Sequence, residues 1–213
     1  MPAMPESADV VIAGGGPVGS ALALALRDSG RRVVLLEARS GSGGDARPLA
    51  LSYGSRLILE RLGVWEALAV TATPIRNIHV SQRGGFGRVG LDAAETGVPE
   101  LGYVVDYTRL SQALEQAVLE SGTVCRQGAR VHAWQGGNPA RVSYELAGVM
   151  QELEAAVLVI ADGGAVSDAA STDYLQSAVT ARVVSERPHN NTAYERFTCD
   201  GPLALLPDGD AWA

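Results

Sequence analysis

Residues 9–26 read DVVIAGGGPVGSALALAL, and this stretch decides the fold. The β-branched residues 9–13 predict a short strand, and the Ala- and Leu-rich residues at the other end predict a helix. Between them, Gly14, Gly16 and Gly19 have the spacing of a loop that turns tightly and lets its backbone approach a pyrophosphate. The stretch therefore predicts a strand, a glycine loop and a helix whose first amide groups face an anion.

A second strand is expected directly after this helix. Residues 32–36 (RVVLL) follow Gly30 and end at Glu37, which makes a βαβ unit with parallel strands and a right-handed crossover. An acid at about this distance from the glycine loop accepts hydrogen bonds from ribose hydroxyls. Glu37 could instead be a solvated carboxylate, but a position at the carboxyl end of a parallel strand favours a ligand. The unit predicts dinucleotide binding, and both NAD and FAD fit.

The rest of the chain suggests two interleaved sheets. Residues 156–160 (AVLVI) are apolar throughout, which predicts a parallel strand buried on both faces, and residues 108–121 predict an amphipathic helix. Further strands are expected at 75–82, 129–134, 141–146, 176–185 and 192–198. The fold class is therefore α/β.

Composition excludes several classes of function. All 17 basic residues are Arg, so Schiff-base lysines and P-loop lysines are absent. A net charge of -7 without a basic stripe argues against nucleic acid as a partner. Cys125 and Cys199 lie far apart with no His at ligand spacing, so no metal site is expected. The three histidines share no motif with a nearby Ser or Cys, so no catalytic side chain is assigned. Without a signal peptide or a long apolar span, the chain is expected to be cytoplasmic.

Six stretches spread over the whole chain carry a family resemblance. They are VVIAGGGPVGSALALAL (10–26), DARPLALS (45–52), LGVWEAL (62–68), LGYVVDYTRLSQALEQAV (101–118), ADG (161–163) and AYERFTCDGPLALLP (193–207). With them the chain resembles the flavoprotein aromatic hydroxylases, most closely the ubiquinone-biosynthesis members of the 2-polyprenyl-6-methoxyphenol hydroxylase type. Family members are longer, so the resemblance implies that this chain lacks their C-terminal part.

The resemblance implies a FAD-binding, Rossmann-like three-layer domain with an interleaved, mainly antiparallel substrate domain. The FAD-binding domain would take residues 1–63 and 102–168, and a partial substrate domain would take residues 64–101 and 169–213.

The resemblance also implies a set of cofactor-binding residues. The loop residues would hold the FAD pyrophosphate, Glu37 the adenosine ribose, and Arg47 the flavin side. Arg109 and Gln112 would contact FAD from a helix, although both could be solvated, and Val131 would approach the adenine, although it could belong to the core. The Asp-Gly turn could also be an ordinary strand end. The full set is Gly14, Gly15, Gly16, Pro17, Gly19, Glu37, Arg47, Arg109, Gln112, Val131, Asp162 and Gly163.

The implied activity is hydroxylation of a prenylated phenol in ubiquinone biosynthesis, with FAD, NAD(P)H and O2. Other ubiquinone-biosynthesis proteins and peripheral contact with the inner membrane surface are compatible with such a substrate. One departure concerns Ser167, after which the family's arginine is missing, so a nicotinamide-side role for this segment is in doubt. An NAD-dependent dehydrogenase and a non-catalytic dinucleotide-binding fragment remain as alternatives.

Overall fold

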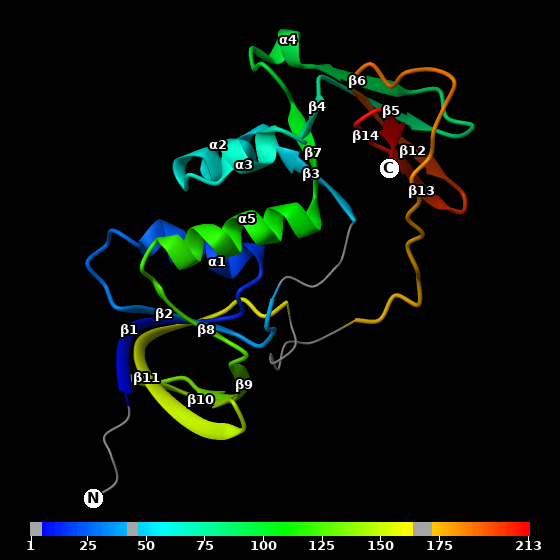
Figure 1. The fold of residues 1–213 in the computed structure, drawn as a ribbon. Helices are drawn as coiled ribbons and strands as arrows, with labels where there is room; N and C mark the ends of the chain where they lie inside the picture. Colours follow the sequence, from blue (N-terminus) through cyan, green and yellow to red (C-terminus); the bar gives the residue numbers. More distant parts are fainter. Residues whose placement is uncertain (1–5, 42–46, 164–171) are drawn as a thin grey trace, which may run out of the picture. The chain divides into compact units, whose positions relative to one another are not determined.

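The computed structural model describes the chain in three stretches (Figure 1), namely residues 6–41, 47–163 and 172–213. The chain folds into two compact units, each held together by contacts within itself. Unit 1 comprises Met1–Gly44 with Ser111–Tyr174, and unit 2 comprises Asp45–Leu110 with Leu175–Ala213. The division into a cofactor domain and a substrate domain, with the boundaries expected from the sequence, stays a prediction.

Unit 1 contains a six-stranded sheet in the order β8-β2-β1-β11-β10-β9. Its strands are β1 (Glu6–Ala13), β2 (Val33–Glu37), β8 (Val124–Gln127), β9 (Arg130–Gln135), β10 (Ala140–Leu146) and β11 (Val149–Ile160). β1 pairs in parallel with β2 and β11, and β2 pairs in parallel with β8. Helix α1 (Pro17–Leu26) joins β1 to β2, which confirms the βαβ unit.

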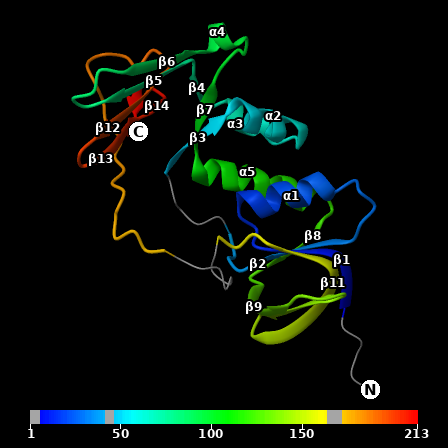
Figure 2. The same ribbon diagram turned by 180° about the vertical axis from the view of Figure 1, so that it is seen from behind.

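Three layers make up unit 1. Helices α1 and α5 (Tyr107–Glu120) lie on one side of the parallel strands, and the antiparallel strands β9 and β10 lie on the other (Figures 1 and 2). Because side chains alternate along a strand, Val11 and Leu36 pack against Val142 and Leu153 of the antiparallel layer. Their neighbours Ile12 and Leu35 are equally buried and point to the opposite face. Alternating apolar residues thus supply a core on both faces of β1 and β2.

A polar network around the buried Tyr144 links the antiparallel layer to the parallel strands. Tyr144 is 1% exposed, and its hydroxyl accepts a hydrogen bond from Arg126 and donates one to Gln151 Oε1 at 2.7 Å. Arg126 also pairs with Glu6 at 2.5 Å, and the Arg126 hydrogen bond is the main cause that holds the pKa of Glu6 below its ordinary value. These contacts join β1, β8, β10 and β11, so the phenolic hydroxyl is satisfied inside the core.

Strand β11 differs from the sequence-based expectation. Residues 151–160 belong to one long strand, and residues 156–160 are not buried on both faces, since Val157 is 52% exposed. The reason is the extent of the neighbouring strand. The pairing of β10 with β11 ends at Ala140–Ala155, so beyond Ala155 the only strand in the described ranges that pairs with β11 is β1. The apolar composition of residues 156–160 therefore did not show that this end of β11 has a neighbouring strand on one side only.

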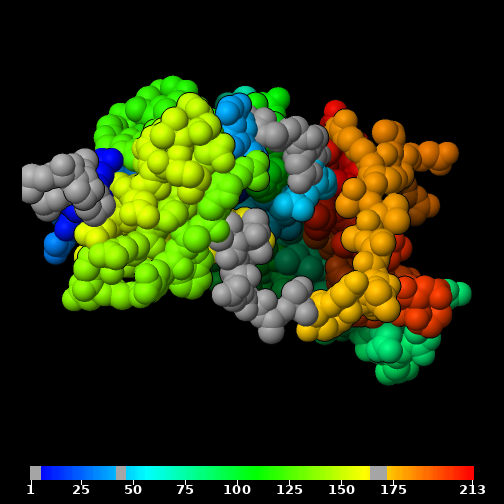
Figure 3. All heavy atoms as spheres, turned by 90° about the horizontal axis from the view of Figure 1, so that it is seen from below, coloured from blue at the N-terminus to red at the C-terminus, as the bar shows by residue number. Residues whose placement is uncertain are grey.

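The strand expected at residues 176–185 is also absent from the described part of the chain. Residues 172–191 are mostly irregular, and their one β contact is an isolated bridge between Val183 and Trp212. Side chains such as Val179 and Val184 are exposed, and the orange atoms of this segment lie on the surface in Figure 3. Alternating apolar and polar residues predicted a strand here, but such a segment forms a strand only where a partner strand pairs with it.

Unit 2 contains two larger sheets and a two-stranded ribbon. The order in the three-stranded antiparallel sheet is β3-β7-β4, and the order in the four-stranded sheet is β13-β12-β5-β6. β12 pairs in parallel with β5, and the other pairs of this unit are antiparallel. The strands are β3 (Pro48–Ser52), β4 (Thr73–Ile75), β5 (Asn77–Gln82), β6 (Arg88–Asp92), β7 (Gly102–Asp106), β12 (Thr192–Thr198), β13 (Gly201–Leu205), β14 (Pro207–Asp208) and β15 (Ala211–Trp212).

Short helices accompany the strands of unit 2, namely α2 (Tyr53–Arg61), α3 (Trp65–Ala69) and α4 (Ala93–Thr96). Ser52 caps α2, since its hydroxyl accepts the backbone N–H of Ser55. Ile75, Val104 and Ala193 form a small core between the two larger sheets of this unit. Within the described residues, no helix has the combined length and hydropathy that crossing a membrane requires. Parallel and antiparallel sheets with helices confirm the α/β class.

Gly19 offers a test of the packing between α1 and β1. An alanine Cβ at this position would lie 1.9 Å from the carbonyl oxygen of Gly14, so we expect Gly19→Ala to lower the free energy of unfolding by at least about 2 kcal/mol. At Gly16 a Cβ meets nothing within 4 Å, so Gly16→Ala should cost less than about 1 kcal/mol. Urea denaturation of both variants measures this difference. Equal stability of the two variants would contradict the packing.

Candidate functional site

The glycine loop begins at Gly14, where the chain leaves β1. Gly14 has φ of +110°, a conformation that favours glycine, and its N–H donates to the Leu36 carbonyl at 2.8 Å. A Cβ here would lie 2.3 Å from the Ala161 carbonyl oxygen. Gly14 is therefore required both for the turn and for the contact with the end of β11.

Helix α1 starts directly above this turn. Gly16 is its N-cap and Pro17 its first residue, and no side chain in the described chain caps the first turn. The space beside Gly16 is open, since a Cβ there meets no atom within 4 Å. The free amide groups and the positive end of the helix dipole thus face an open space that suits an anion.

Gly15 brings the loop against Glu37 at the end of β2. The Gly15 N–H donates to Glu37 Oε2 at 2.6 Å, and a Cβ on Gly15 would lie 2.8 Å from Glu37 Cβ. The other carboxylate oxygen, Oε1, accepts from the backbone N–H of Arg39 at 2.8 Å and from Arg39 Nε at 2.9 Å. The carboxylate is thereby fixed beside the start of α1.

These contacts keep Glu37 ionised. Burial acts to raise the pKa of Glu37, but the hydrogen bonds from Arg39 and Gly15 and the charge of Arg39 together lower this pKa below its ordinary value. An ionised carboxylate only accepts hydrogen bonds, so a hydroxyl that reaches Glu37 has to donate. Ribose hydroxyls meet this requirement.

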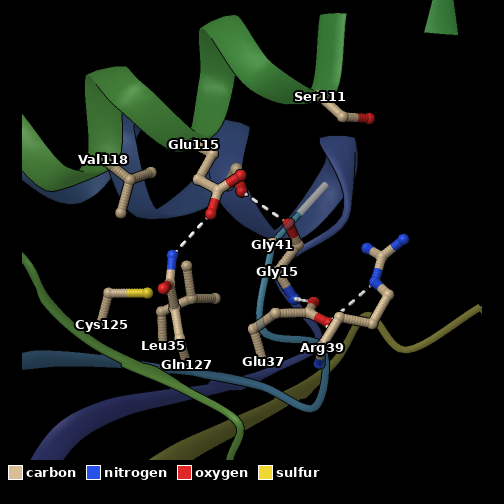
Figure 4. A pocket seen from close by; sticks show the side chains of 11 residues that line it. Gly15, Leu35, Glu37, Arg39, Gly41, Ser111, Glu115, Val118, Cys125 and Gln127 are labelled. Atoms are coloured by element: carbon tan, nitrogen blue, oxygen red, sulfur yellow. Dashed lines mark hydrogen bonds and ion pairs between the residues drawn. The ribbon is translucent and has the colours of Figure 1, made fainter. Parts of the chain in front are cut away.

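A hollow lies beside this carboxylate, between β2, β8 and helix α5 (Figure 4). The hollow measures about 30 Å³, which is small, so we expect a ribose to lie over it and not inside it. Gln127 Nε2 donates to Glu115 Oε1 at 2.5 Å across one wall. Ser111 also lines the hollow, and its buried Oγ has no hydrogen-bond partner among the residues that the structure describes. A hydroxyl left in this state can still bond to a ligand.

The predicted Asp162-Gly163 turn lies beside the glycine loop. A Cβ on Gly14 would be 2.7 Å from Asp162 Cα, and Gly163 has φ of +74°. The loop, Glu37 and this turn all stand at the carboxyl ends of parallel strands, where ligands of such sheets bind. The structure thus brings together eight of the twelve predicted residues, namely Gly14, Gly15, Gly16, Pro17, Gly19, Glu37, Asp162 and Gly163.

The other four predicted residues make contacts that do not involve the glycine loop or Glu37. Val131 is half-buried and packs against the core of unit 1. Arg109 and Gln112 are exposed on α5, and the Arg109 backbone N–H donates to Asp106 Oδ1 at 2.9 Å. Arg47, in unit 2, has its guanidinium carbon 4.8 Å from the centre of the Tyr107 ring. Their contacts with a cofactor stay predictions.

The lining residues that were not predicted from the sequence include Arg39, Ser111, Glu115 and Gln127. Gln127 lies opposite Glu37 in the β2–β8 pairing, so placing β8 next to β2 would have identified it. Arg39 follows Glu37 by two residues, and its pairing depends on the turn after β2. Ser111 and Glu115 reach the hollow only because their face of α5 packs against the sheet, and the sequence did not show which face does so.

A glycine loop, an uncapped helix N-terminus and a fixed acid on the next strand define a dinucleotide-binding protein of the α/β class. The comparison with known families specifies the dinucleotide. Residues 7–187 match the FAD binding domain family, and the chain belongs to this family. FAD is therefore favoured over the NAD alternative that Glu37 alone left open.

Two relatives are hydroxylases. The chain is 33% identical over 225 residues to 3-demethoxyubiquinol 3-hydroxylase of Escherichia coli strain K12, an alignment that covers 98% of this chain and 56% of the relative. It is 34% identical over 221 residues to ubiquinone hydroxylase UbiL of Rhodospirillum rubrum, covering 94% of this chain and 49% of the relative. The chain thus spans about half the length of these relatives.

Solved structures agree with this family. The anhydrotetracycline hydroxylase OxyS of Streptomyces rimosus matches with a TM-score of 0.63 and 29% identity, covering 74% of this chain and 32% of that chain. The p-nitrophenol 4-monooxygenase PnpA of Pseudomonas putida matches with a TM-score of 0.72 over 97% of this chain and 57% of that chain, at 18% identity. The second match supports the fold alone.

The lowered pKa of Glu37 predicts a pH-dependent stability. Its contribution is fully present above the ordinary glutamate pKa and is lost as the pH falls through the lower folded-state value. Wild type should therefore exceed Glu37→Gln in free energy of unfolding by about 1–2 kcal/mol near neutral pH, and the difference should vanish in acid. Denaturant titrations across pH measure it. The control Glu60→Gln, on exposed helix α2, should change stability by less than about 1 kcal/mol. A Glu37 difference that grew in acid would refute the assignment.

Proposed function

We propose that the chain holds the adenosine half of FAD in an FAD-dependent hydroxylase of ubiquinone biosynthesis, acting on a prenylated phenol with NAD(P)H and O2. The observation that carries the proposal is the contact between Gly15 and Glu37 beside the open N-terminus of α1. This contact puts an anion site next to a hydrogen-bond acceptor, as a pyrophosphate joined to a ribose requires.

The residues present fit FAD in three respects. The open space beside Gly16 is where a pyrophosphate can approach the backbone, since any larger residue would fill it. Glu37 can accept the ribose hydroxyls. The orphaned Ser111 hydroxyl gains a partner when a polar ligand covers the hollow. Bound FAD would supply the redox chemistry of the hydroxylation, while the protein binds and orients it.

The names of the relatives support the reaction. Two of them are a 3-demethoxyubiquinol 3-hydroxylase and a ubiquinone hydroxylase, and the structural neighbour OxyS is an anhydrotetracycline hydroxylase. A prenylated phenol is the substrate class that fits those names. In this proposal Arg47 serves the flavin side, and the remaining predicted contacts come from Arg109, Gln112 and Val131.

Loss of the open space at Gly16 should abolish FAD binding without unfolding the protein. We expect Gly16→Val to weaken FAD binding at least about 100-fold, because the side chain would occupy the place of the pyrophosphate. Glu37→Gln, which removes the charge, should weaken binding by about tenfold. Isothermal titration with FAD measures both effects, and circular dichroism checks the fold.

Gly136→Val is the matched control. Gly136 lies between β9 and β10, and a Cβ there also meets nothing within 4 Å. This variant should bind FAD like wild type. FAD affinity that is unchanged in Gly16→Val, or lost equally in Gly136→Val, would overturn the proposed position of the cofactor.

We also propose that the protein contacts the inner membrane surface peripherally, since a prenylated substrate partitions into a bilayer. Phe86 supports this contact, because its ring is fully exposed in the glycine-rich turn between β5 and β6. Phe residues of membrane-surface helices enter the headgroup region, and we expect the Phe86 ring to do the same from its turn. Phe86→Ser should reduce co-sedimentation with vesicles of anionic phospholipid by about threefold or more. Equal co-sedimentation of Phe86→Ser and wild type would contradict the role of this turn.

A further inference from the structure

Three neighbouring parallel strands of unit 1 end side by side. In the sheet order β1, β2, β8, the first strand leads into the glycine loop, the second ends at Glu37 and the third ends at Gln127. Glu37 and Gln127 are partners in the β2–β8 pairing, so their backbones are about 4.8 Å apart. The order across the sheet is therefore an anion site, an acceptor for hydroxyl groups, and Gln127.

The side-chain amide of Gln127 has a defined orientation. Its Nε2 donates to Glu115 Oε1 on α5 at 2.5 Å (Figure 4). A carboxylate accepts hydrogen bonds, so the amide nitrogen faces Glu115 and the amide oxygen, Oε1, faces away from it. Gln127 Oε1 has no hydrogen-bond partner within the described ranges, and the residue is exposed. Glu115 thus holds an available acceptor at the end of β8.

The hollow beside this amide is apolar at its base. Leu35 and Val118 are both 1% exposed, and they line the hollow together with the half-buried Cys125. Burial is the main cause that raises the pKa of the Cys125 thiol, so the thiol is neutral. A flat ring over the hollow would therefore meet neutral, apolar atoms below it and the Gln127 acceptor at its edge.

We propose that Gln127 recognises the adenine base of the bound dinucleotide by accepting a hydrogen bond from its amino group, and that Glu115 is the positioning residue for Gln127. The sheet order carries this assignment, because loop, acid and amide follow one another as pyrophosphate, ribose and base do in an adenosine nucleotide. Adenine has a donor at this edge, its N6 amino group, whereas a base with a keto oxygen has an acceptor there. The inference rests on the proposed binding of FAD.

Two dinucleotides that differ at this edge of the base test the proposal. Flavin hypoxanthine dinucleotide carries a keto oxygen in place of the N6 amino group of FAD. This oxygen would face Gln127 Oε1, acceptor against acceptor, so the full chain should bind FAD at least about tenfold more tightly. Isothermal titration measures both affinities. Equal affinities would overturn this inference and leave the proposed function standing, whereas binding of neither dinucleotide would overturn both.

Substitutions assign the preference to the two residues. Gln127→Leu should lower the preference for FAD to about twofold or less, because leucine has no acceptor. Glu115→Leu should also lower it, since the Gln127 amide could then turn its nitrogen toward the base. Glu115→Gln should keep the preference, because the new amide oxygen can still accept from Gln127 Nε2. An unchanged preference in Gln127→Leu, or a loss in Glu115→Gln as large as in Glu115→Leu, would refute these roles.

Gln116 and Glu120 provide a matched control on the same helix. Gln116 Nε2 donates to Glu120 Oε1 at 2.5 Å, both residues are exposed, and neither lines the hollow. Gln116→Leu and Glu120→Leu should therefore leave the ratio of the two affinities unchanged, and circular dichroism checks the fold of every variant. A ratio that fell equally in Gln116→Leu and Gln127→Leu would show a general effect on the protein and would overturn the proposed contact.

Discussion

The close approach of the glycine loop to the ends of β2 and β11 is the constraint on which the rest of unit 1 depends. Gly14 touches the Ala161 carbonyl, Gly15 touches Glu37, and Gly19 lets α1 begin directly on the strand end. Larger side chains at these positions would push the helix away from the sheet. With the helix in place, its N-terminus and the Glu37 carboxylate lie next to each other, which is the arrangement that a pyrophosphate joined to a ribose needs.

The two units carry different chemistry. Unit 1 has a fixed acid beside open amide groups, which suits an anionic nucleotide. Unit 2 has a sheet face with Arg88 and Arg196, whose hollow has no acidic residue among the lining residues that the structure describes. Membership of the FAD binding domain family supports a flavin dinucleotide as the ligand of the first site.

The sequence predicted correctly those parts of the fold whose structure depends mainly on their own residues. The βαβ unit over residues 9–37 was correct because its glycines, helix formers and apolar strand all agree. The expectations failed where a neighbour decides the outcome, as at Val157 beyond the end of β10 and in residues 176–185. In the same way, Glu37 could be predicted from its distance to the loop, whereas Ser111 and Gln127 could not, because they reach the hollow through the packing of α5 and β8.

The most direct test of the central claim is an NMR titration of ¹⁵N-labelled protein with FAD. If the loop holds the pyrophosphate, the amide signals of Gly15, Gly16 and Val18 should shift most, and that of Gly136 should stay unchanged. The Ser111 amide should shift as well, because the Ser111 side chain lines the hollow beside Glu37. Saturable binding of FAD that leaves the loop amides unmoved would contradict the account.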